Sequence, residues 1–123
     1  MLRELPKVKQ VDGEPKRRWF FCHEIDLVVF EDGGGVCGFQ LAYDKQRNEH
    51  SIAWSRDRGF THYVVDDGEP FAGVDETPFL YANGPFKRDR VLEQFLALAT
   101  EVPADIAAFV AGKLREFDGP TLP

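Results

Sequence analysis

The feature that most constrains the fold is a change of hydrophobic period part-way along the chain. Between residues 17 and 66, apolar and polar side chains alternate in short runs separated by Gly, Asp and Asn, which is typical of β-strands joined by turns. Beyond residue 85, apolar side chains recur every three or four residues, as on one face of a helix. We therefore expect an α+β fold: an antiparallel β-meander of about four to six strands, followed by two C-terminal amphipathic α-helices packed on one face.

Turn-forming residues delimit the strands of this meander. The segment from Asp32 to Gly35 is expected to form a hairpin turn, because glycine adopts positive φ at little steric cost. Pro78 would restrict the last strand to an edge, because proline cannot donate to a neighbouring strand. The expected strands are 17–22 at an edge, then 25–31, 36–43, 49–56, 60–66 and a short one at 77–82.

Two of these strands predict their own register. If Tyr43 pairs with His50 across the polar turn at 44–48, then Phe39 lies opposite Trp54 on the same face. We expect the helices to cover that face and to leave Trp54 largely buried. The opposite face is formed by small and mostly uncharged residues, namely Gly38, Gln40, Ala42, Ser51, Ala53 and Ser55.

Two helices are expected after residue 85, and Pro103 separates them because it cannot continue the first. Each helix has one apolar face that needs a surface to cover, and the large-residue face of the sheet is that surface. These faces consist of Val91, Leu92, Phe95, Leu96, Leu98 and Ala99 in the first helix, and of Ile106, Ala107, Val110, Leu114 and Phe117 in the second.

The length of 123 residues suits one domain, which we place at 17–123. Residues 1–16 lack periodicity and are interpreted as an extended basic N-terminal arm. The net charge of −6 disfavours nucleic acid as a partner, because that affinity comes largely from neutralising phosphates. No apolar run resembles a signal peptide or a membrane span, and the two cysteines do not suggest a disulfide framework, so we expect a cytoplasmic protein without a membrane partner.

Three strings in the sequence carry a resemblance. They are Arg17-Arg-Trp-Phe20, Gly38-Phe-Gln-Leu41 followed by Tyr43-Asp-Lys45, and Val65-Asp-Asp-Gly-Glu69. With these strings the chain resembles a group of short uncharacterised bacterial proteins, from Arg17 through the helices. No activity is attached to that group, so the resemblance implies a bacterial cytoplasmic protein and transfers no site.

No motif assigns a catalytic residue, a metal or a cofactor. Cys22, His23, Cys37, His50 and His62 are the soft metal ligands available, but they lack the short paired spacing of zinc sites, so neither a metal nor any other cofactor is expected. The run of glycines at 33–35 lacks the Lys-Ser/Thr of a phosphate loop, and no G-x-S-x-G elbow is present.

The small-residue face of the sheet motivates the first functional hypothesis. A face exposed only to water usually carries long charged side chains, whereas small neutral residues let another backbone or a flat ligand approach closely. We therefore expect a non-enzymatic binding or self-associating domain whose partner is a second copy of the chain or another protein; a cover formed by the N-terminal arm is an equal alternative. The candidate binding residues are Gln40, Tyr43, His50, Ser51, Ser55 and His62. The alternative function is a small enzyme with its site at a sheet end, where His62 acts with Gln40, Tyr43 or His50.

Overall fold

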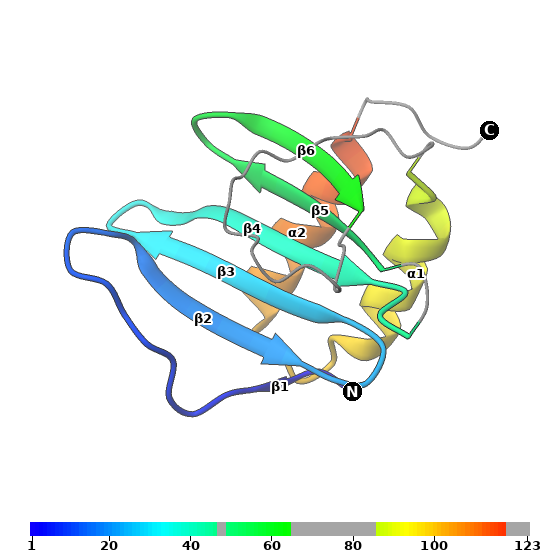
Figure 1. Ribbon diagram of the computed structural model, residues 1–123, viewed down its shortest axis with the longest axis horizontal. Helices are drawn as coiled ribbons and strands as arrows, with labels where there is room; N and C mark the ends of the chain where they lie inside the picture. The colour runs from blue at the N-terminus through cyan, green and yellow to red at the C-terminus, as the bar shows by residue number, and fades with distance from the viewer. Residues whose placement is uncertain (47–48, 65–85, 118–123) are drawn as a thin grey trace.

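The computed structural model describes residues 1–46, 49–64 and 86–117, so the strand expected at 77–82 lies outside the described residues. Within these residues, six strands form one antiparallel sheet in the order of the sequence, and two helices follow (Figure 1). The expected α+β fold is confirmed. The elements are β1 (Arg3–Glu4), β2 (Lys16–Phe21), β3 (Asp26–Asp32), β4 (Gly35–Tyr43), β5 (His50–Ser55), β6 (Gly59–Val64), α1 (Arg88–Leu98) and α2 (Ala104–Glu116).

The register between β4 and β5 is the predicted one. Tyr43 pairs with His50 and Phe39 pairs with Trp54. Gly38 precedes Phe39 on β4, and glycine suits this position because a Cβ there would lie 3.0 Å from the carbonyl oxygen of Trp54. The hairpin between β3 and β4 is also confirmed, and Gly35 in it has a φ of 102°, which favours glycine.

Both helices pack behind one face of the sheet, so the core lies between two layers (Figure 1). The face built by Leu27, Leu41 and Ile52 is fully buried there. The predicted stripe of α2 is buried along Ile106, Val110 and Leu114, as expected for an amphipathic helix. The stripe predicted for α1 was too wide by one residue: Val91, Phe95 and Ala99 are buried, whereas Leu96 is 44% exposed because it lies beyond the edge of that face. In the described part of the chain, neither helix has the length and apolar character needed to cross a membrane.

Trp54 lies at the margin of the core rather than at its centre. Its side chain is only partly buried, whereas Phe39 opposite it is fully buried. The Trp54 ring packs edge-on against Phe109 of α2, with ring centroids 5.4 Å apart. The ammonium of Lys113 lies 4.4 Å from the centre of the Trp54 ring, so a cation rather than an apolar side chain covers part of it.

The N-terminal segment is built into both layers. Leu2 is fully buried and its backbone N–H donates to the carbonyl of Leu98 at the end of α1. Arg3 and Glu4 form β1 against β2, so the strand that we expected at an edge is covered along part of its length. The segment interpreted as an arm therefore contributes to the folded core at its start.

Candidate functional site at one end of the sheet

Three of the predicted binding residues come together where β4 ends and β5 begins. Tyr43 and His50 are direct cross-strand partners, and His62 on β6 pairs with Ile52, two residues along from His50. Because side chains two residues apart share a face, all three point toward the helix-covered side of the sheet. Alternation alone left the face of His62 open, and the β5–β6 pairing places it beside the other two.

These side chains form a stack of rings beneath Phe86. The Tyr43 hydroxyl and His62 Nε2 lie 2.5 Å apart and share a hydrogen bond. The rings of His50 and His62 are stacked, with centroids 5.5 Å apart. The rings of Phe86 and His62 are in T-shaped contact with their centroids 5.2 Å apart, and Phe86 is fully buried. Since Tyr43 is only 3% exposed, the stack is part of the core as much as it is a polar cluster.

Burial moves the pKa values of Tyr43 and His62 in opposite directions. Loss of hydration raises the pKa of the Tyr43 phenol well above its ordinary range, and the nearby Asp44 carboxylate raises it further. The same loss of hydration lowers the pKa of His62 to about 4, with a smaller contribution from the neighbouring His50. Both groups are therefore neutral at pH 7, and the hydrogen bond between them joins two uncharged partners.

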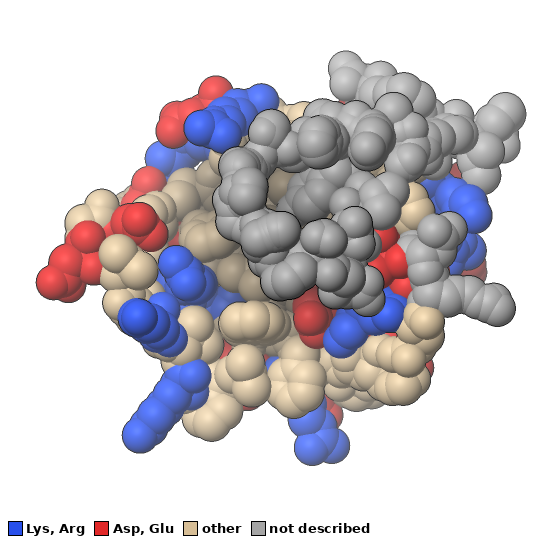
Figure 2. Space-filling model, in the orientation of Figure 1, with Lys and Arg blue, Asp and Glu red and all other residues tan. Residues whose placement is uncertain are grey.

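The other three predicted residues lie on the opposite face of the sheet. Gln40 is exposed, Ser55 is half-buried and Ser51 is 4% exposed. Gln40 pairs with Ala53, and Ser51 pairs with Ala42, so these side chains project away from the helices. Figure 2 shows this outer face, on which acidic and basic side chains of the described residues are interspersed around the margin. The predicted set therefore divides between two faces and does not form one site.

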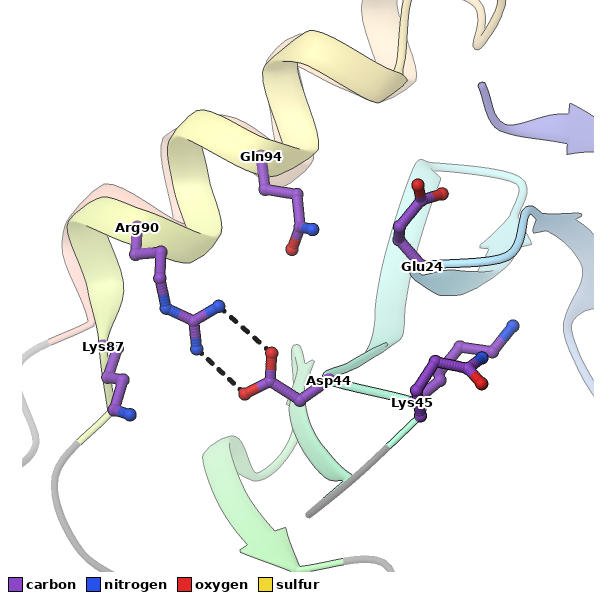
Figure 3. A pocket seen from close by; sticks show the side chains of 7 residues that line it. Glu24, Asp44, Lys45, Lys87, Arg90 and Gln94 are labelled. Carbon is purple, nitrogen blue, oxygen red and sulfur yellow. Dashed lines mark hydrogen bonds and ion pairs between the residues drawn. The ribbon is translucent and has the colours of Figure 1, made fainter.

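A pocket of about 460 Å³ lies beside the ring stack, between α1 and the loops at this end of the sheet (Figure 3). Three segments line it: the loop between β2 and β3, the turn after β4, and the first two turns of α1 with the residue before them. Every lining side chain is charged or carries an amide. The residues are Glu24, Asp44, Lys45, Gln46, Lys87, Arg90 and Gln94.

Asp44 joins the pocket to the ring stack. Its backbone φ is 56°, a left-handed conformation that Asp tolerates better than most residues. Its carboxylate accepts two hydrogen bonds from the Arg90 guanidinium, at 2.9 and 3.1 Å (Figure 3). That pair fixes the turn after β4 to the first turns of α1 and raises the pKa of Arg90, so the guanidinium stays charged.

A second cation of the pocket is held by the sheet. The Lys45 ammonium donates to the carbonyl oxygen of Cys22 at 2.7 Å and to the Asp26 carboxylate at 2.8 Å. In Figure 3 its amine end points away from Arg90. Lys45 therefore ties the turn after β4 to the loop before β3, and most of its charge is compensated.

Two lining residues have a polar group without a hydrogen-bond or ion-pair partner in the described part of the chain. The Oε1 atom of Gln94 is buried and has no hydrogen-bond partner in the described part of the chain. Lys87 is exposed, and its ammonium forms no ion pair or hydrogen bond within the described ranges 1–46, 49–64 and 86–117. Leaving a buried acceptor without a donor costs roughly 1–3 kcal/mol, so Gln94 is where a bound molecule or water gains most.

Sequence reasoning did not single out the pocket residues. Five of the seven carry a full charge, and surface charges are the residues that periodicity places least well. One weak signal was present, since Lys87, Arg90 and Gln94 recur at the spacing of a single helical face. Within the described residues, no three His, Cys, Asp or Glu side chains gather as a metal site.

No family model, curated protein or solved structure matches this chain. The chemistry of the site therefore rests on geometry. Within the described residues the pocket combines fixed ion pairs with a cation that no acid neutralises and an acceptor without a donor, which suits it to holding a small molecule by charge and hydrogen bonds.

Proposed function

We propose that this chain is a non-enzymatic binding domain that holds a small polar molecule in the pocket at the end of the sheet. The observation that carries the proposal is the pocket itself, where seven charged or amide side chains surround about 460 Å³. That volume lies in the range of small-molecule sites, and its lining is fixed by the Asp44–Arg90 and Lys45–Asp26 pairs.

The pKa values favour binding over the enzymatic alternative at the same end of the sheet. General acid–base catalysis works best when the catalytic pKa lies near the working pH. Tyr43 and His62 are shifted away from neutrality in opposite directions, so neither exchanges a proton readily at pH 7. Tyr43 is also almost fully buried, which keeps it from a molecule in the pocket.

The experiment compares a blocked pocket with an equally bulky change elsewhere. Gln46→Trp places an indole at the pocket wall, and Gln40→Trp places one on the outer face of the sheet; both glutamines are exposed. Four five-carbon probes serve as ligands: glutarate, 5-aminovalerate, cadaverine and xylitol. Calorimetry should detect binding of at least one probe to the wild type and to Gln40→Trp, and none to Gln46→Trp.

The probes are used at up to about 20 mM, because weak small-molecule binding has a Kd near 1 mM or above. If no probe binds the wild type, or if Gln46→Trp binds as well as Gln40→Trp does, the pocket is not the binding site and the proposal is wrong.

Self-association through the outer face is a second candidate function. On that face Trp19 is 37% exposed and Phe21, two residues along β2 and on the same side, is 43% exposed, so two large aromatic side chains adjoin on the surface. The row that begins with Trp19 continues across the sheet through Val28 and Gln40 to Ala53, and none of these side chains is charged. A second copy of the chain would cover these aromatics.

A bacterial cytoplasmic location belongs to the same proposal. Cys22 and Cys37 are both unpaired and partly buried, and the reducing cytoplasm keeps such thiols free. A partner among proteins or small molecules fits the negative net charge better than nucleic acid does.

A further inference from the structure

We propose that the pocket selects a short zwitterion, a molecule whose carboxylate and ammonium groups lie at opposite ends of a small chain. The inference rests on the proposed function and names the class of ligand. Its basis is that the two ends of the pocket offer opposite chemistry: a cation that no acid neutralises within the described residues at one end, and acceptors at the other.

The cationic end is formed by Lys87. Three cations and two carboxylates line the pocket, but Arg90 is paired with Asp44 and Lys45 with Asp26. Lys87 is the lining cation that no acid neutralises in the part of the chain that the structure describes. An anion that enters the pocket therefore gains most at Lys87.

The acceptor end is formed by Gln94 and Glu24. Within the described residues Gln94 Oε1 is buried without a donor, and Figure 3 shows the side chain directed from α1 into the space between the Arg90–Asp44 pair and Glu24. A hydrogen bond from the Cys22 thiol lowers the pKa of the Glu24 carboxyl, so Glu24 is ionised at neutral pH. An acceptor amide and a carboxylate that line the same pocket match an ammonium group, which only donates.

The spacing along α1 sets the length of the ligand. Lys87 and Gln94 are seven positions apart in the sequence, which corresponds to about 10 Å along a helix. Both side chains are long, so their ends can approach a molecule shorter than that separation. Because the Arg90–Asp44 pair lies between them, a ligand reaching both ends needs several bonds between its charged groups. An α-amino acid with only one carboxylate is too short for this.

Three probes of equal length isolate the two ends. Glutarate has two carboxylates, cadaverine has two ammonium groups, and 5-aminovalerate has one of each. Calorimetry should show that 5-aminovalerate binds the wild type most tightly, about fivefold or more ahead of each of the others, because only it matches both ends.

Two variants then assign the ends. Lys87→Ala should weaken 5-aminovalerate and glutarate about three- to tenfold and leave cadaverine nearly unchanged. Gln94→Leu keeps the side-chain volume and should weaken 5-aminovalerate and cadaverine but not glutarate. Lys9→Ala, at an exposed lysine that does not line the pocket, is the control and should change none of them.

The outcomes separate the two proposals. If a probe binds and Gln46→Trp abolishes that binding, but 5-aminovalerate has no advantage, then the pocket is a site for another ligand and the zwitterion inference is wrong. If no probe binds the wild type, the inference and the proposed function fail together. Lys87 is exposed, so its substitution tests the cationic end even if Gln94→Leu destabilises the fold.

Discussion

His62 is a residue whose charge state is set by where the fold places it. Its ordinary pKa of 6.5 falls to about 4 in the folded chain because burial removes hydration from the charged ring. Between these pH values the unfolded chain binds more protons than the folded chain does. Its contribution to stability is therefore complete above about pH 6.5 and is lost as the pH falls to about 4.

We expect the free energy of unfolding to fall by about 1–2 kcal/mol over that window, a value reduced from the full shift because the ring is partly solvated. Urea denaturation at a series of pH values measures it. His62→Gln, which cannot be protonated there, should flatten the dependence between pH 6.5 and 4. A variant with the same pH dependence as the wild type would show that His62 is not the titrating group.

The other residues of the site show which features a sequence predicts at this scale. Tyr43 and His50 were predicted together because cross-strand register follows from alternation. Gln94 was not predicted, because an amide on a helix carries no signal until its neighbours are known. Its importance arises only from the burial of Oε1 against a pocket built by distant segments.

The packing of α2 on the sheet depends on Trp54 less than the alternating pattern suggests. Alternation placed Trp54 on the correct face but gave no information about how far the helices extend over it. Phe109 and Lys113 of α2 contact the ring at its margin, while Phe39 lies fully buried beside it. Alternation therefore predicts the face of a strand residue, and only the three-dimensional packing determines its depth.

We expect Trp54→Ala to lower the free energy of unfolding by about 2–3 kcal/mol, less than the roughly 3–5 kcal/mol typical of a fully buried aromatic. Phe39→Ala, at the paired position on β4, should cost more because Phe39 is fully buried. Chemical denaturation of both variants measures the difference. A larger loss for Trp54→Ala than for Phe39→Ala would contradict the placement of Trp54 at the core margin.

The short first strand shows the lower limit of such predictions. Arg3 and Glu4 have no alternation to detect, and both side chains are exposed. Their place in the sheet depends on Leu2, which is buried against the far end of α1. This two-residue strand is fixed by a contact with a helix almost one hundred residues away in the sequence. The local sequence therefore does not predict it.

Across the whole molecule the two faces of the sheet differ in what covers them. One face is sealed by the helices, and the other combines exposed aromatics on β2 with small residues on β4 and β5. Ala53 lies within the small-residue rows and is only partly exposed. The outer face is therefore where self-association would be seen.

Ala53→Arg adds a long charged side chain to that face without touching the core. If the face meets only water, stability should change by about 0.5 kcal/mol or less. If the face holds a second copy, the variant should lose self-association or lose clearly more stability than that. Light scattering together with thermal melts distinguishes these outcomes, and two monomers with matching melts would end the self-association proposal.

The most direct test of binding at the sheet end is a map of backbone amide shifts by NMR as 5-aminovalerate, glutarate and cadaverine are titrated in turn. The three segments that line the pocket should respond: residues near Glu24, residues 44–46 and residues 87–94. Amides along β2 and the middle of β3, which do not line it, should stay in place. Shifts concentrated on those three segments would support a ligand pocket at the end of the sheet. Shifts spread over the outer face, or none with any of the three probes, would contradict it.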